Sequence, residues 1–192
     1  MIVAPLTFVR VGLLLILAVI LQVSAVSQTT IFGGHADLVV LTVAAIAYYG
    51  GSVSGCAVGF AAGFLLDLAS GATMGASSLV LTAIGYCVGR FRELRDPSHG
   101  LMPALVGAAA TAGWVLTFAA VSFMLDVGAR VSPLVIRDMV VTVVLNTLIA
   151  IPVFVVIRRV LRGSLQVDPV ERGRRRAQPR EAGPIGLRGL EI

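Results

Sequence analysis

Residues 38–66 read LVVLTVAAIAYYGGSVSGCAVGFAAGFLL, a run of 29 residues without a charge between Asp37 and Asp67. A membrane-spanning helix needs roughly 20 apolar residues, so this run is long for one span and short for two. The glycine pair at its middle is typical of a turn. The run therefore predicts a hairpin of two short helices, at about 36–49 and 53–68.

The composition on both sides of this hairpin is that of a membrane protein. Hydrophobic residues make up 57% of the 192 residues, charged residues make up 13%, and the mean hydropathy is +0.96. Soluble domains are about half apolar and a quarter charged. The other predicted spans are 8–26, 75–89, 101–125 and 134–157. We therefore predict an all-α polytopic membrane protein, a six-transmembrane-helix bundle over residues 1–162 with no room for a soluble catalytic domain.

The first predicted span also has features of a secretory signal peptide. Arg10 lies near its start, and Val23-Ser24-Ala25 has the small residues of a cleavage site. We favour a retained span, because further spans follow it rather than an exported domain.

The arginines set the predicted topology, because cytoplasmic loops near span ends carry an excess of positive charge. All 15 basic residues are arginine. Six spans place Arg10, the cluster at 90–95 and the arginine-rich tail on one side, and leave Arg130 and Arg137 on the other. Both termini are therefore predicted to be cytoplasmic. Clustering of this kind favours topology signals over nucleic-acid binding, so no nucleic-acid partner is expected.

The tail at 163–192 combines arginine with glycine and proline and has almost no aliphatic periodicity. This composition predicts a disordered cytoplasmic tail. Its arginines can hold it near anionic membrane lipid. The alternative is a docking strip for a cytoplasmic partner.

Glycines recur at a spacing of four in the third predicted helix and again in the fourth. Residues three or four apart share a helix face, so the glycines form a groove that lets another helix backbone approach closely. The groove either packs inside this chain or receives a partner helix, and the third and fourth helices are expected at the centre of the bundle. The glycines are Gly51, Gly55, Gly59, Gly63, Gly85 and Gly89.

Three polar residues lie at or near membrane depth. Asp37 begins the second helix, where the helix dipole favours a negative charge, and this predicts a capping role. Asp67 ends the third helix, where the dipole disfavours it, so a partner is expected. That partner is either Arg130 or Arg137 within the bundle, or a basic residue of another protein. Asn146 is predicted to form a hydrogen bond to a neighbouring helix.

The sequence contains no pattern that predicts catalysis, a cofactor or a metal site. Cys56 and Cys87 lie in apolar runs without a CxxC partner or a nearby histidine. The serines at 75–78 would need a general base within hydrogen-bond reach to act as a nucleophile. His35 and His99 lie in loops predicted on opposite sides of the membrane, so an enzyme is not expected.

Three stretches carry a family resemblance: GFAAGFLLDLASG at 59–71, MGASSL at 74–79 and GYCVGR at 85–90. They are similar to the central signature of the MreD family of rod shape-determining proteins. The similarity extends over about residues 10–162 and leaves the tail unmatched. The signature loop and polar positions are Asp67, Gly71, Gly75, Tyr86 and Asn146.

The resemblance implies a non-catalytic subunit of the bacterial elongasome in the cell (inner) membrane, involved in cell-shape maintenance and lateral peptidoglycan synthesis. Members associate with the single-span protein MreC. Through it they are linked to the RodA glycosyltransferase with its class B penicillin-binding transpeptidase, and indirectly to MreB. The resemblance also implies a fold similar to that of the six-helix substrate-binding subunits of energy-coupling-factor transporters. An outer helix face and the loop at 67–75 are the expected contacts with MreC.

The main alternative is a substrate-binding subunit of a small-molecule, vitamin-type membrane transporter. A ligand site of that kind needs polar and aromatic groups that converge in a pocket. The polar groups predicted within the spans are few, mainly Gln22, Asp67, Tyr86 and Asn146. Their scarcity favours a scaffold.

Overall fold

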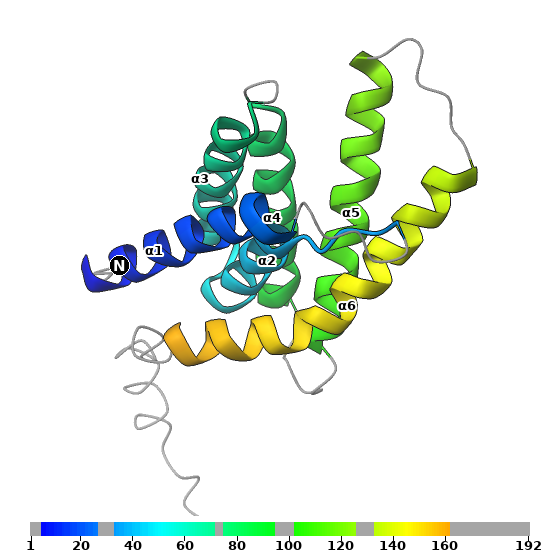
Figure 1. Cartoon of the computed structure of the whole chain (residues 1–192). Coiled ribbons are helices and arrows are strands. Elements are labelled where there is room, and N and C mark those ends of the chain that lie inside the picture. Colours follow the sequence, from blue (N-terminus) through cyan, green and yellow to red (C-terminus); the bar gives the residue numbers. More distant parts are fainter. Residues whose placement is uncertain (1–4, 27–32, 72–74, 95–101, 126–132, 162–192) are drawn as a thin grey trace, which may run out of the picture.

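The structure is a computed structural model that describes residues 5–26, 33–71, 75–94, 102–125 and 133–161. In these ranges the chain forms six α-helices and no β-sheet, which confirms the predicted all-helical class (Figure 1). A short π-helix, Gln22–Val26, extends the first of them. The α-helices are α1 (Pro5–Leu21), α2 (Leu38–Gly50), α3 (Ser52–Ser70), α4 (Ala76–Leu94), α5 (Met102–Leu125) and α6 (Pro133–Leu161).

Some sequence predictions fall outside the described residues. They concern the arginine-rich tail at 163–192, Arg130 and His99.

Three described helices are long and apolar enough to cross a membrane: Ser52–Ser70, Met102–Ala120 within α5, and Val135–Leu161 within α6. Two further apolar helices, Val9–Ser24 and Leu38–Gly50, are shorter. Helices satisfy their own backbone hydrogen bonds, which is why apolar runs of this length fold as helices in lipid. The six-span topology itself stays a prediction.

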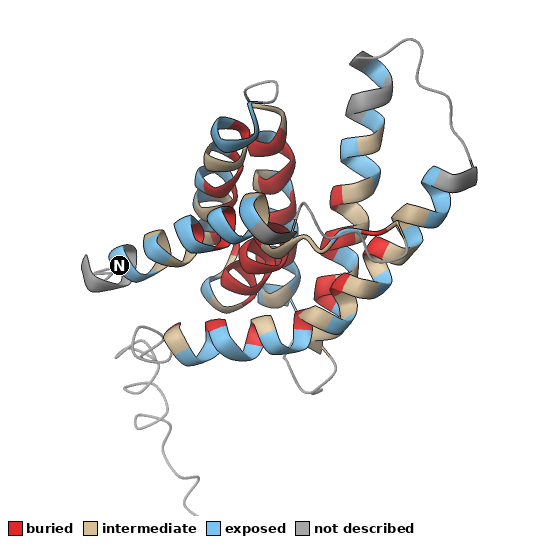
Figure 2. Cartoon of the chain, in the orientation of Figure 1, coloured by how far each residue is buried: buried red, intermediate tan, exposed pale blue. Residues whose placement is uncertain are grey.

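The centre of the bundle is α2, and the expectation that α3 and α4 would occupy it is wrong. Ten of the 13 residues of α2 are buried, from Val39 to Tyr48. α2 contacts all five other α-helices, and Figure 2 shows buried residues concentrated on α2 and on the facing sides of α3 and α4. α2 can be surrounded because it is apolar all round, and Ala44, Ala45 and Ala47 leave space for neighbouring helices.

Gly51 makes the sharp turn between α2 and α3. Its φ of +89° lies in the region that favours glycine, and its N–H donates to the Ala47 carbonyl at 2.9 Å, closing α2. A single residue therefore separates the two helices, and α3 begins directly beside the end of α2.

α5 and α6 pack on each other and cover one side of α2. Gly107 of α5 lies against Ala150 of α6, where an added Cβ would overlap the alanine side chain. α6 contains Pro152 and bends along its length in Figure 1. Proline removes a backbone hydrogen bond and accounts for a local kink in this helix.

Candidate functional site

The glycine stripes of α3 and α4 face each other. An added Cβ at Gly55 would overlap the Gly85 carbonyl, and one at Gly85 would overlap the Gly55 carbonyl. Gly59 lies against the backbone at Leu81 in the same way. Further along, Gly63 meets the backbone of Ser78. The groove predicted on α3 is thus filled by the backbone of α4.

Gly51 and Gly89 extend the same contact at the other end of the pair. An added Cβ at Gly89 would overlap the backbone of Gly51 and Ser52. Apolar burial does not drive helix association in lipid, because the lipid chains are as apolar as the side chains. Close backbone packing of this kind supplies dispersion contacts instead, and it makes α3 and α4 a tightly packed pair.

A carboxylate at the end of α3 holds the start of α4. Asp67 is 2% exposed, and its Oδ2 accepts from the Gly75 N–H at 2.8 Å and from the Ser78 hydroxyl at 3.4 Å. Its Oδ1 accepts from the Ser77 N–H at 3.3 Å. The first N–H groups of a helix have no partner within the helix and carry positive partial charge, so a carboxylate satisfies them well.

This arrangement differs from the ion pair expected for Asp67. The described Arg137 is exposed on α6 and forms no ion pair with Asp67. The dipole at the end of its own helix disfavours Asp67, but the start of the next helix favours it. Gly71, in the left-handed conformation that ends α3, and Gly75, with a φ of +100°, lie in the turn that brings these two helix ends together.

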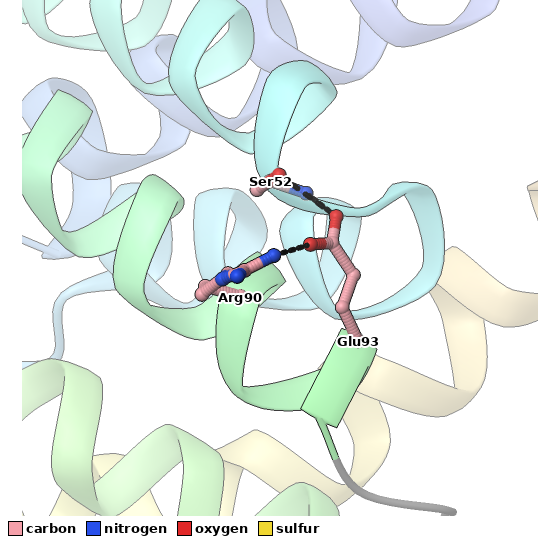
Figure 3. A network of polar contacts seen from close by, with 3 residues as sticks. All are labelled: Ser52, Arg90 and Glu93. Carbon is pink, nitrogen blue, oxygen red and sulfur yellow. Dashed lines mark hydrogen bonds and ion pairs between the residues drawn. The ribbon is translucent and has the colours of Figure 1, made fainter.

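A second carboxylate at the end of α4 holds the start of α3. Glu93 Oε1 accepts from the Ser52 N–H at 2.9 Å and from the Ser52 hydroxyl at 2.7 Å, and Figure 3 shows both groups approaching one carboxylate oxygen. Glu93 Oε2 forms an ion pair with Arg90 at 3.1 Å. Arg92 donates to the Tyr49 carbonyl and lies over the Tyr48 ring. Arg92 thereby joins the end of α4 to the end of α2, whereas Arg90 pairs with Glu93 on its own helix.

The two helices are therefore clasped at both ends, each by a carboxylate from the end of the other. We call Asp67 with its donors the upper clasp and Glu93 with Ser52 the lower clasp. The sequence analysis missed the lower clasp. Its signal in the sequence is reciprocal: each of the two helices has a serine in its first turn and an acid in its last turn.

The hydrogen bonds of Glu93 in the lower clasp predict how the stability of the fold depends on pH. Glu93 lies beyond the predicted span 75–89, and its pKa is held below the usual 4.5, chiefly by the Ser52 backbone N–H, then by the Ser52 hydroxyl and by Arg90. A lowered pKa means that the stabilisation is complete above pH 4.5 and is lost as the pH falls through the folded-state pKa. The thermal unfolding temperature of the wild type should therefore drop more than that of Glu93→Gln between neutral pH and about pH 3.5. If the unfolding temperatures of the two proteins fall by the same amount, Glu93 does not cause the loss of stability in acid.

A third polar cluster surrounds the start of α2. The Gln22 carboxamide accepts from the Leu38 N–H at 2.8 Å and donates to Asp37 Oδ1 at 3.1 Å. The Asn146 carboxamide accepts from the Asp37 N–H at 2.8 Å and donates to Asp37 Oδ2 at 3.5 Å. Two carboxamides from the π-helix and α6 thus cap α2 and hold Asp37 between them.

The capping role predicted for Asp37 is wrong, because the carboxamides of Gln22 and Asn146 accept from the N–H groups at the start of α2 instead. Its side chain makes no cap hydrogen bond to α2, although it occupies the N-cap position. The residues before it lie close to α6, because the His35 N–H donates to Thr142 Oγ1 at 3.1 Å and a Cβ on Gly34 would overlap the backbone of Thr142. Because of this proximity, the side chain of Asn146 accepts a hydrogen bond from the Asp37 N–H, although the two residues are 109 positions apart.

Three further positions singled out in the sequence lie on α4. Tyr86 is 49% exposed on α4. Ser77 and Ser78 are buried in the upper clasp, where Asp67 accepts their hydrogen bonds. Within the described ranges, no group of three histidine, cysteine or acidic side chains lies close enough to hold a metal ion.

A large apolar groove of about 630 Å³ lies between α4 and α5. We call it the α4–α5 groove. Its walls are Ala83, Ile84, Cys87, Val88 and Phe91 on one side, and Met102, Leu105, Val106, Ala109, Ala110, Gly113 and Thr117 on the other. Polar atoms are scarce in these walls, so the groove suits an apolar surface better than a polar small molecule.

Comparison with known families gives a match over most of the chain. The family model described as rod shape-determining protein MreD matches residues 4–163. This range contains both clasps, the polar cluster at α2 and the α4–α5 groove. No curated protein and no solved structure matches the chain.

Proposed function

The chain belongs to the MreD family of rod shape-determining proteins, and from this membership we propose that it is a non-catalytic membrane scaffold of the bacterial elongasome. Its family role is rod shape determination, and its apolar helices make it a membrane protein. In the proposal, it holds an MreC-like single-span protein. That protein in turn recruits the RodA glycosyltransferase with its class B penicillin-binding transpeptidase and, indirectly, MreB.

The proposed location is the bacterial inner membrane, with six spans and both termini in the cytoplasm. The lower clasp with Arg90 and Arg92 then faces the cytoplasm, together with Arg158 and Arg159 at the end of α6. The upper clasp faces the opposite side. This orientation follows the excess of positive charge expected on cytoplasmic flanks.

The clasped helix pair is the observation on which the scaffold proposal rests. A scaffold has to present a fixed surface, and α3 and α4 are fixed along their length by backbone contact and at both ends by carboxylates. The outer face of α3 stays exposed and apolar, with Val53, Phe60 and Leu68 each more than half exposed. That face is available to lipid or to another membrane protein.

The transporter alternative requires a polar ligand site. The buried polar side chains Asp67 and Asn146 are already hydrogen-bonded within the chain. The α4–α5 groove has almost entirely apolar walls. Small-molecule sites combine apolar walls with a few placed polar groups, so this arrangement favours the scaffold.

The test is affinity purification of the tagged full chain from its own cells in mild detergent, with co-purified proteins identified by mass spectrometry. An untagged strain is the control. The scaffold proposal expects MreC and the RodA pair to be enriched, and depletion of the chain to turn rod-shaped cells round. Enrichment of an ATPase module with a small energy-coupling subunit would support the transporter instead. Recovery of neither set from cells that express both would contradict the scaffold proposal.

A further inference from the structure

A second apolar groove, of about 220 Å³, lies between α1 and α6, which both pack on α2. We call it the α1–α6 groove. Leu14 and Leu17 line it from α1, and Val153 and Val156 line it from α6. The buried Thr42 of α2 closes its inner side.

The two walls of this groove start from a common point at Asp37. Gln22, directly after α1, and Asn146 of α6 both donate hydrogen bonds to the Asp37 carboxylate. Arg10 precedes Gln22 by 12 residues, and Arg159 follows Asn146 by 13 residues. A helix rises 1.5 Å per residue, so each arginine lies roughly 18–20 Å along its helix from Asp37. Figure 1 shows the blue start of α1 and the orange end of α6 on the same side of the bundle.

Both arginines lie on the helix faces that form the groove. Residues three or four apart share a helix face. Arg10 is four residues before Leu14, and Arg159 is three residues after Val156, so each continues one wall. Both side chains are exposed. The groove therefore ends between two guanidinium groups, one from each wall.

The positive charge at this end of the groove is not balanced by acidic side chains of the described residues. Within these residues, Arg10, Arg158 and Arg159 form no ion pair. Glu93 is the acid described at this end of the bundle, and its carboxylate is engaged by Arg90 and Ser52. The other described acids lie near the start of α2, the end of α3 and the start of α6. An anion from outside the chain would supply the missing charge.

The length of the groove fits one leaflet of a membrane. The α1 wall reaches from Arg10 to Leu21, which is 11 residues and roughly 16 Å of helix. Half of a hydrocarbon core is roughly 15 Å thick. A partner helix that crosses the membrane is about twice as long as this wall, whereas an acyl chain of one leaflet matches it.

We propose that the α1–α6 groove binds an anionic phospholipid of the leaflet on the side of Arg10 and Arg159. One acyl chain lies between Leu17 and Val156, and the phosphate is held by the two arginines. Basic pockets between membrane helices on the cytoplasmic side bind anionic headgroups, and this is the end of the chain that is predicted to be cytoplasmic. The site is separate from the proposed contact with an MreC-like protein and does not depend on it.

The test measures lipid binding to the purified, delipidated full-length chain by native mass spectrometry. Phosphatidylglycerol and phosphatidylcholine with the same acyl chains are titrated in parallel. The wild type should bind phosphatidylglycerol more than tenfold more tightly, because each arginine near an anionic lipid contributes about a fivefold gain. Arg10→Gln and Arg159→Gln should each lose about fivefold in affinity for phosphatidylglycerol and keep that for phosphatidylcholine. Equal affinities of the wild type for the two lipids would overturn the proposal.

Arg137→Gln is the matched control. It removes the same charge from an exposed position of α6 at the opposite end of the bundle, so its affinity for phosphatidylglycerol should equal that of the wild type. A loss as large as that of Arg159→Gln would show that net charge, and not this site, attracts the lipid. Thermal unfolding of all variants monitors the fold.

Photocrosslinking of the wild type gives a second measurement that needs no variant to fold. Phosphatidylglycerol with a photoreactive group midway along an acyl chain is mixed into phosphatidylcholine vesicles that hold the full chain. The label should be found mainly at 14–21 and 152–157, and excess inorganic phosphate should not displace it. Equal labelling of Leu79, which is 72% exposed on α4, would overturn the groove assignment. Displacement by inorganic phosphate would show a site for a free anion and would also overturn it.

Discussion

Asp67→Ala should destabilise the folded chain by roughly 3–5 kcal/mol, since each buried donor left without an acceptor costs about 1–3 kcal/mol. The substitution removes the acceptor of the Gly75 and Ser77 N–H groups and of the Ser78 hydroxyl. It also removes the negative charge from the start of α4, where the helix dipole favours it. The expected result is a lower thermal unfolding temperature in detergent and less chain in the membrane.

Asp67→Asn is the graded control for this experiment. It keeps one carbonyl oxygen as an acceptor but loses the charge, so its unfolding temperature should lie between those of the wild type and Asp67→Ala. If Asp67→Ala unfolds at the wild-type temperature, the upper clasp does not stabilise the fold. A folded Asp67→Asn chain that fails to maintain rod shape would point to the other role considered for Asp67, contact with a basic residue of a partner.

Gly59→Ala should destabilise the folded chain by about 3 kcal/mol or more, because the added methyl would overlap the backbone of α4, which cannot move aside as a side chain can. The new Cβ would overlap the Leu81 carbonyl and crowd the Cα of Thr82. α3 and α4 would have to move apart, and this movement would lengthen the hydrogen bonds of both clasps. Thermal unfolding of the purified chain measures the effect.

The control carries the same substitution in open space. Gly12→Ala adds a Cβ to α1 where nothing lies within 4 Å, so it should stabilise the chain by up to about 1 kcal/mol through helix propensity. The two variants are therefore expected to shift the unfolding temperature in opposite directions. Shifts of equal sign and size would falsify the close contact at Gly59.

The described helices could be predicted from the sequence because lipid leaves an apolar run few alternatives. A chain without water has to satisfy its backbone hydrogen bonds internally, so each apolar stretch becomes a helix. The spacing of Gly55, Gly59 and Gly63 predicted close approach by another helix backbone, and α4 makes that approach. The signature around Asp67 also pointed to the family whose model matches residues 4–163.

The sequence could not predict which helix lies at the centre. In water, the polar face of a helix marks the outside of a protein, but lipid and protein interior are equally apolar, and α2 carries no such mark. Its burial becomes visible only when the five surrounding helices are in place.

The polar contacts also depend partly on the sequence alone and partly on how the helices pack. The sequence by itself determined the helical class, the turn at Gly51, the need for a partner at Asp67 and the family. Only the tertiary structure decided that Asp67 holds the start of α4, that Glu93 holds the start of α3, and that Asn146 reaches α2 across 109 positions. Helix formation depends on neighbours along the chain, whereas a carboxylate or carboxamide takes whichever helix end the packing brings within hydrogen-bond distance.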